Sequence, residues 1–137
     1  MRTKSNTQWK QGFSNYRKAL SQLNKFINKE QLNEFEEQSL FQEFVYTYEL
    51  ACNLLIDYLY ERQTPNIHSA RDAIRVAYSL DLIEDGDSWM DMNKNLTQSS
   101  HIHNQNAAKL MAANITKNFL RLFEKFEDKM QSLYDTN

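Results

Sequence analysis

The sequence predicts an all-α protein: an antiparallel up-and-down bundle of four to five helices in a single domain over residues 1–137. Through most of the chain, apolar residues recur at the three- and four-residue spacing of one helix face. The chain has only two glycines and one proline, too few for the turns of an all-β fold of this length. A chain of 137 residues is long enough for one domain with one core.

The first helix is expected to begin near residues 5–7, where a serine or threonine can cap it. Its apolar positions follow one another at intervals of four, three, four, three and four residues: Trp9, Phe13, Tyr16, Leu20, Leu23 and Ile27. This stripe indicates a helix with one buried face. The polar and charged residues 24–37 are interpreted as a connection that runs into the next helix.

The second helix is expected from about Asn33 to Arg62. Its inner face would carry Phe41, Phe44, Tyr48, Ala51, Leu55, Tyr58 and Leu59, and a second row holds Leu40, Val45, Cys52 and Leu54. Apolar residues on more than one face imply burial on two sides. We therefore expect this helix either to be central or to meet a second subunit as well.

Two shorter helices follow. Pro65 ends the second helix, because a proline disfavours helical backbone at the residue before it. Ser69 is expected to cap a third helix, and after a turn at Gly86 either Asp87 or Ser88 caps a fourth. The inner residues of these two helices would be Ala70, Ala73, Ile74, Ala77 and Leu80 in the third, and Trp89, Met90 and Met92 in the fourth.

The last helix is expected from about Asn104 to Leu133. At helical spacing it carries Ala107, Leu110, Met111, Asn114, Ile115, Phe119, Leu122, Phe123, Phe126, Met130 and Leu133. Because the aromatic residues of all these helices follow the helix repeat, we interpret them as core rather than as a cofactor site or a base-stacking platform.

Composition excludes several classes of function. The chain has no glycine-rich phosphate loop, and so we expect no cofactor. No apolar run is long enough for a membrane span or a signal peptide, and the single cysteine, Cys52, cannot form an internal disulfide. These features predict a cytoplasmic protein that does not act at a membrane. The net charge of −2 does not favour nucleic-acid binding, although a local basic patch would be compatible with it.

The polar run "NKNLTQSSHIHNQNAAKL", residues 93–110, contains His101 and His103 just before the last helix. No cysteine or carboxylate stands nearby to complete a zinc site, and so we expect no metal. Histidine exchanges protons near neutral pH and is the usual base for RNA cleavage, which also needs a cation beside the phosphate. From composition alone, an exposed histidine near a helix start is the simpler interpretation.

A resemblance to a known family bears on whether His101 is catalytic or only an exposed histidine. It is carried by four stretches of the chain: "WKQGFSNYRKAL", "FVYTYELACNLLIDYL", "AIRVAYSLDLIEDGDSWMDM" and "QSSHIHN". In this order, and over residues 9–133, the sequence resembles the HEPN proteins known as nucleotidyltransferase substrate-binding proteins. The resemblance implies a HEPN-like helical bundle that forms a homodimer. It also implies a partner, a minimal nucleotidyltransferase (MNT), in a toxin–antitoxin pair. In such pairs the HEPN subunit is the ribonuclease, and the MNT silences it by attaching AMP to a tyrosine of its motif.

The chain departs from the family motif, which reads Arg-Asn-x-x-x-His-x-Tyr. His101 is retained, but Leu96 stands in place of the arginine, Thr97 in place of the asparagine and His103 in place of the tyrosine. Leucine cannot carry charge or donate hydrogen bonds to a phosphate. Lys94 would supply a positive charge nearby, although without the bidentate geometry of arginine. The missing tyrosine also removes the hydroxyl that would accept AMP.

The sequence therefore favours a HEPN-type binding subunit that dimerises and pairs with an MNT-like nucleotidyltransferase, with a degenerate ribonuclease motif. The alternative is an active toxin, a metal-independent endoribonuclease that uses His101 with a cation from Lys94, Arg71 or Arg75, in which case RNA would be a ligand. The sequence does not decide whether the chain is an enzyme, and the replacement of the motif arginine by Leu96 favours a binding role.

Overall fold

The computed structural model of the chain describes residues 3–29, 31–98 and 105–136, and the side chains of residues 8–29, 31–94 and 110–136. Its helices are α1 (Thr3–Ile27), α2 (Glu34–Glu61), α3 (Ala70–Ser79), α4 (Gly86–Gln98), α5 (Gln105–Asn114) and α6 (Leu120–Thr136). A π-helical segment, η2 (Ile115–Phe119), joins the last two without a break. The predicted all-α bundle is confirmed, and the described residues include no strand.

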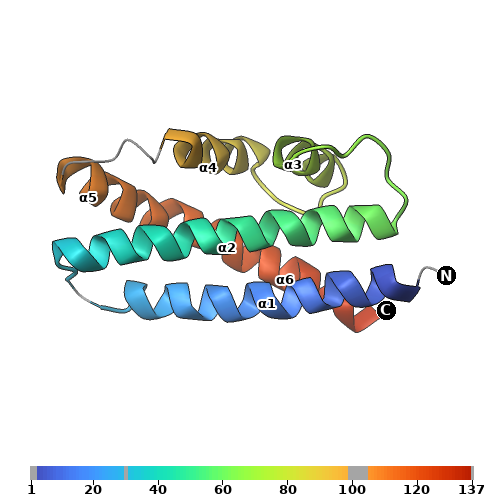
Figure 1. Cartoon of the computed structure of the whole chain (residues 1–137), viewed down its shortest axis with the longest axis horizontal. Coiled ribbons are helices and arrows are strands. Elements are labelled where there is room, and N and C mark those ends of the chain that lie inside the picture. Colours follow the sequence, from blue (N-terminus) through green and yellow to red (C-terminus); the bar gives the residue numbers. More distant parts are fainter. Residues whose placement is uncertain (1–2, 30, 99–104, 137) are drawn as a thin grey trace.

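Helix α2 is the centre of the bundle. It packs against α1, α3 and α5, and α1 also packs against α6 (Figure 1). Its buried residues lie on more than one face, as the two apolar rows of the sequence predicted. The sequence left two explanations for these two rows, a central position in the bundle or contact with a second subunit. Within one chain, α2 is a central helix.

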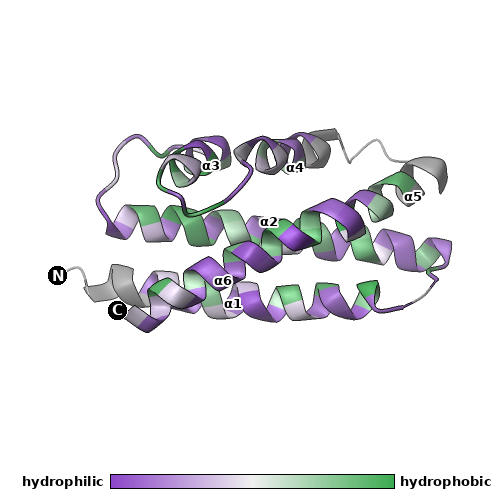
Figure 2. Cartoon of the chain, turned by 180° about the vertical axis from the view of Figure 1, so that it is seen from behind, coloured by the Kyte–Doolittle hydropathy of each residue, from purple (hydrophilic) through white to green (hydrophobic). Residues whose placement is uncertain are grey.

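The core is rich in aromatic rings. Its largest fully buried side chains include Trp9, Phe13, Tyr16, Phe44, Trp89, Phe123 and Phe126. The ring of Phe44 stacks on the rings of Phe119 and Phe123, with centroids 5.5 Å and 5.6 Å away. Offset and edge-on contacts of this kind stabilise a core beyond the area that the rings bury. Hydrophilic (purple) and hydrophobic (green) residues alternate along α1 and α6, as expected for helices with one solvent-exposed and one buried face (Figure 2).

Two helix starts differ from the prediction. Helix α1 begins at Thr3, earlier than the expected cap at residues 5–7. Helix α4 begins at Gly86 itself, and its cap is Asp85 rather than Asp87 or Ser88, because the Asp85 carboxylate accepts hydrogen bonds from the backbone N–H and the hydroxyl of Ser88. The start of α2 agrees well: Asn33 and Glu36 exchange the two hydrogen bonds of a capping box.

Three residues expected on inner faces lie outside. Leu80 and Leu110 are 53% and 70% exposed, and Asn114 is also exposed. Leu80 comes just after the end of α3, where the backbone leaves the helix and no longer follows its face. Leu110 and Asn114 precede the π-helical segment, and the extra residue in a π turn shifts the apolar face from that point on. The expected single last helix is therefore two α-helices with this shift between them.

Candidate functional site

The predicted motif lies where α4 ends and α5 begins. Lys94 is on α4, and so are the backbones of Leu96 and Thr97, whose side chains are outside the described set. His101 and His103 lie outside the described residues altogether. Helix α4 ends at Gln98 and α5 begins at Gln105, and the start of α5 lies beside the start of α2 (Figure 1).

Helix α4 is held in place by its buried side. Trp89 is fully buried, with its ring centroid 5.7 Å from that of Phe123 and 5.5 Å from that of Phe126. Met92 is fully buried as well. A packed tryptophan has few alternative positions in a dense core, so these contacts fix the helix axis that leads to the motif.

A hydrogen bond between side chains then fixes the last part of α4 to the central helix. The amide of Asn93 donates to the hydroxyl of Tyr48 over 3.1 Å. Burial raises the pKa of Tyr48, and the neighbouring Cys52 raises it further. A tyrosine that is neutral at all ordinary pH values keeps this contact independent of pH. The motif, which begins three residues later at Leu96, therefore follows a residue that is hydrogen-bonded to the central helix.

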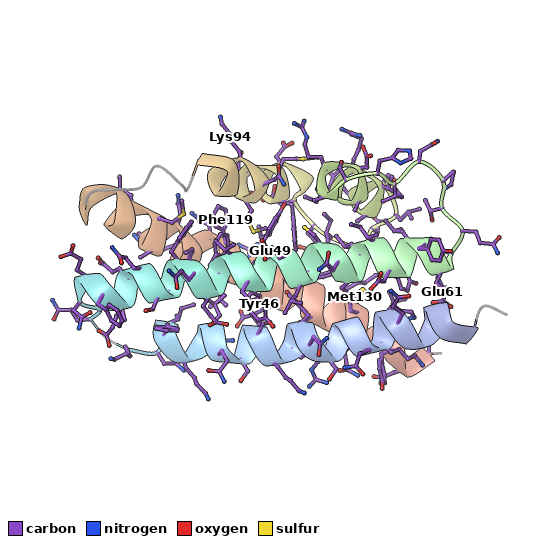
Figure 3. The ribbon with its side chains drawn as sticks, viewed as in Figure 1. Tyr46, Glu49, Glu61, Lys94, Phe119 and Met130 are labelled. Carbon is purple, nitrogen blue, oxygen red and sulfur yellow. The ribbon has the colours of Figure 1, made fainter. Side chains whose placement is uncertain are left out.

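Lys94 is exposed and points away from the bundle at the end of α4 (Figure 3). The other two candidate cations lie elsewhere. Arg71 and Arg75 are exposed on α3, beside the start of α4 rather than its end, and the guanidinium of Arg75 pairs with Asp72 at 3.3 Å. Of the three cations, only Lys94 stands on the helix that carries the motif.

A polar cavity of about 250 Å³ lies beside the first turns of α4, between them and the π-helical segment. Its lining includes Asp85, Asp91, Asn118 and Arg121. π-Helical turns occur often at functional sites, because they turn side chains away from the regular helix spacing. The described residues here hold no group of three or more His, Cys, Asp or Glu side chains that could bind a metal ion.

The single thiol is placed as expected for an inert cysteine. Cys52 is buried in α2, and its thiol forms a hydrogen bond with the hydroxyl of Tyr48. Burial raises the pKa of its thiol to about 11. Because the thiolate is the reactive form, this environment makes the side chain a poor nucleophile.

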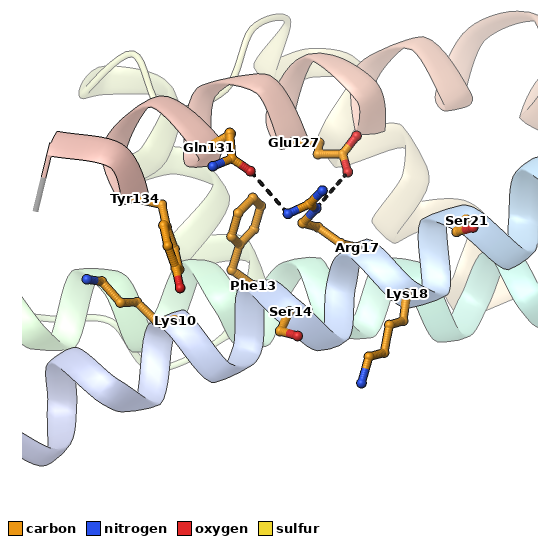
Figure 4. A pocket seen from close by; sticks show the side chains of 9 residues that line it. All are labelled: Lys10, Phe13, Ser14, Arg17, Lys18, Ser21, Glu127, Gln131 and Tyr134. Atoms are coloured by element: carbon orange, nitrogen blue, oxygen red, sulfur yellow. Dashed lines mark hydrogen bonds and ion pairs between the residues drawn. The ribbon is translucent and has the colours of Figure 1, made fainter.

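A groove of about 470 Å³ between α1 and α6 was not predicted from the sequence (Figure 4). In it the guanidinium of Arg17 reaches across to Glu127, with 3.4 Å between Nε and Oε2, and to Gln131, with 3.2 Å between Nη1 and Oε1. At one end the ammonium of Lys10 lies 4.9 Å from the centre of the Tyr134 ring. The available signal was charge: α1 contains lysines and an arginine but no acidic residue.

No helix in the described parts of the chain is both long enough and apolar enough to cross a lipid bilayer. Residues 11–132 match the sequence model of a protein family described as "nucleotidyltransferase substrate binding protein like". Comparison with curated proteins gives no match.

Proposed function

Because the chain belongs to the nucleotidyltransferase substrate binding protein like family, we propose that it is a HEPN-type binding subunit that pairs with an MNT-like nucleotidyltransferase. The family match over nearly the whole chain is the observation that carries this proposal. The all-helical bundle around α2 supports it, since that is the architecture the resemblance implies. The toxin–antitoxin role of such pairs belongs to the same proposal.

Homodimer formation is part of this proposal. Several large apolar side chains are exposed although they lie on well-formed helices, among them Phe35, Tyr46 and Tyr60 on α2 and Leu110 on α5. Tyr46, near the middle of α2, is 53% exposed. A contiguous exposed apolar patch is typical of a surface that meets a partner, and we propose that these side chains contribute to one. A second copy of the chain, related by a two-fold axis, would cover such a surface on both subunits at once.

The ribonuclease motif is proposed to be degenerate. Leu96 removes the cation that steadies the phosphate, and an electrostatic contact of this kind commonly contributes about 10²–10³ in rate. The exposed Lys94 carries a positive charge on the same helix but cannot make the bidentate hydrogen bonds of an arginine to a phosphate. We expect the chain to cleave RNA slowly or not at all, with His101 as the retained general base.

The pairing is tested by co-expression. A tagged copy of the chain, co-expressed with the MNT-like nucleotidyltransferase that this proposal assigns to it as a partner, should retain that enzyme through size-exclusion chromatography. An unrelated nucleotidyltransferase serves as the control. Separate elution of the two chains at micromolar concentration would contradict the proposal.

The state of the motif is tested by substitution. Leu96→Arg should raise RNA cleavage at least tenfold, because the missing contribution is local and electrostatic. Adding His101→Ala should abolish the gain, since a cation without a proton-transfer group cannot run the reaction. A lower melting temperature without a gain in cleavage would show that Leu96 is a packing residue and that the motif is a relic. Growth arrest by the unmodified chain, relieved by His101→Ala, would instead identify an active toxin.

A further inference from the structure

Charge is separated between the two longest helices. Helix α1 contains Lys4, Lys10, Arg17, Lys18 and Lys25 and no aspartate or glutamate. Helix α2 shows the reverse, with many acidic residues and no lysine or arginine. The net charge of −2 therefore hides one strongly basic helix in an otherwise acidic chain.

The outer side of α1 has an unusual composition. Its exposed side chains between residues 8 and 25 are Gln8, Gln11, Ser14, Asn15, Arg17, Lys18, Ser21, Gln22 and Lys25. Every one of these can donate a hydrogen bond, and none is acidic or apolar. We call these residues, together with the half-buried Lys10, the basic face of α1. The opposite side of the helix is anchored in the core by Trp9, Tyr16 and Leu23, so the basic face is presented on a rigid support.

The groove beside α6 extends this face. Arg17 is fixed in the groove by Glu127 and Gln131, whereas Lys18 points away from both, toward solvent (Figure 4). The cations thus follow one another along the helix and do not converge on a single point. From Lys10 to Lys25 the helix rises by about 22 Å. An extended anion fits this arrangement better than a compact one.

The composition also discriminates between kinds of partner. Stable protein interfaces have a core of aromatic and aliphatic residues and are depleted in lysine. Helices that lie on membranes need a large apolar face. The exposed residues of the basic face offer neither. Contacts to the phosphates of nucleic acids, in contrast, come from lysine, arginine, serine, asparagine and glutamine side chains, which is the set that this face presents.

We propose that the basic face of α1 binds the phosphodiester backbone of a nucleic acid, without sequence preference. The proposal does not use His101 or the motif, and it requires neither ribonuclease activity nor a nucleotidyltransferase. Three to four cations along the face would each neutralise one phosphate. For a single strand, this predicts that log K falls with log salt with a slope of about −2 to −3.

The test is fluorescence anisotropy with labelled 20-mers of mixed sequence, one of RNA and one of DNA. The protein is the full-length chain carrying His101→Ala, so that cleavage cannot affect the readout. A change from 50 to 200 mM salt should weaken binding roughly 20- to 50-fold. Equal binding of RNA and DNA locates recognition in the phosphates, and preference for RNA adds the 2′-hydroxyl to the contacts. Absence of binding at 50 mM salt overturns the proposal.

Matched variants assign the binding to α1. Lys18→Gln with Lys25→Gln should flatten the slope by about 1.4 and weaken binding by up to about 60-fold at 50 mM salt, because two phosphate contacts are lost. Lys117→Gln with Lys125→Gln is the control, since both of these lysines are exposed but lie in the last helices. An equal loss in both pairs would mean that the binding follows net charge rather than the basic face, and would contradict the proposal.

A third variant should strengthen binding, which misfolding cannot imitate. Glu127→Gln removes the carboxylate that neutralises Arg17 in the groove, and so it should tighten binding and steepen the salt slope by up to about 0.7. The pair is partly exposed, and such pairs contribute little to stability. Weaker binding by Glu127→Gln would overturn the role of the groove. Poly-glutamate that binds as tightly as the oligonucleotide would show that the face recognises an acidic protein instead.

Discussion

Replacing Tyr16 by phenylalanine should destabilise the protein at neutral pH and protect it in alkali. Tyr16 is fully buried on α1, and its hydroxyl donates a hydrogen bond of 2.7 Å to the backbone carbonyl of Phe123 on α6. Burial, together with the negative charges of Glu127 and Glu124, raises the pKa of this tyrosine well above 10. The same hydroxyl therefore determines both effects.

The loss at neutral pH follows from the hydrogen bond. Phenylalanine keeps the ring contacts of Tyr16, whose centroid lies 5.4 Å from that of Phe126, and removes only the oxygen. Losing a buried hydrogen bond of this kind lowers the free energy of unfolding by about 1–2 kcal/mol. For a domain of this size, that corresponds to a decrease of roughly 3–8 °C in melting temperature.

The gain in alkali follows from linkage. In the unfolded chain Tyr16 ionises with a pKa of about 10, whereas in the folded protein it keeps its proton to a much higher pH. The raised folded pKa contributes stability that is fully present below pH 10 and is lost as the pH rises through the folded pKa. At pH 11 the wild type has lost about 1.4 kcal/mol by this route, and the variant has lost none of it. The two stability curves should therefore cross near pH 11.

Urea unfolding at intervals between pH 7 and pH 11.5, followed by circular dichroism, measures both effects. Tyr46→Phe is the matched control, because it removes a tyrosine hydroxyl that is exposed on α2, and it should change stability at pH 7 by less than about 0.5 kcal/mol. A Tyr16→Phe curve that stays parallel to the wild type up to pH 11.5 would refute the reasoning. It would show that the hydroxyl is not buried.

Other predictions rest on single features. The buried Cys52, with its thiol pKa raised to about 11, should react with Ellman's reagent at pH 8 only as fast as the protein opens, and fully in denaturant. Trp89→Ala, which removes a fully buried ring, should cost about 3–5 kcal/mol of stability, against less than 1 kcal/mol for Tyr78→Ala at an exposed ring. Light scattering at micromolar concentration should give twice the monomer mass, and Tyr46→Glu with Tyr60→Glu on the exposed side of α2 should shift it toward monomer. An unmodified chain that is monomeric would exclude the homodimer.

The helices could be predicted from sequence because their apolar residues follow one period for long stretches. The stripe from Trp9 to Ile27 gave the buried side of α1, and the two rows of α2 gave a helix covered on several sides. Both signals are sums over many residues, which local exceptions do not change. The helix starts were less certain, because Asp85, Asp87 and Ser88 are all good capping residues and only the backbone decides among them.

The candidate site could be predicted less completely, for physical reasons. The π-helical segment has no distinctive composition, so the sequence of the last helix concealed the shift that exposes Leu110 and Asn114. The anchoring of α4 through Asn93 and Tyr48 joins residues 45 positions apart, and no local pattern reports such a contact. The basic face of α1 was visible in the composition of that helix, but the balanced total charge obscured it.

The two proposed surfaces belong to different parts of the bundle. The basic face is the outer side of α1, whereas the motif begins on α4, which packs on α3, on Tyr48 of α2 and, through Trp89, on α6. Both α1 and α4 contact α6, but Lys18 and Lys25 are exposed on the outer side of α1, away from the helix on which the motif begins (Figure 1). Substitutions without shared contacts usually have additive effects, to within about 0.3–0.5 kcal/mol. Lys18→Gln with Lys25→Gln should therefore weaken nucleic-acid binding equally in the wild type and in Leu96→Arg. If the two sets of substitutions instead change the binding free energy non-additively by more than about 0.5 kcal/mol, one bound strand contacts both α1 and the motif, either in one subunit or across a dimer.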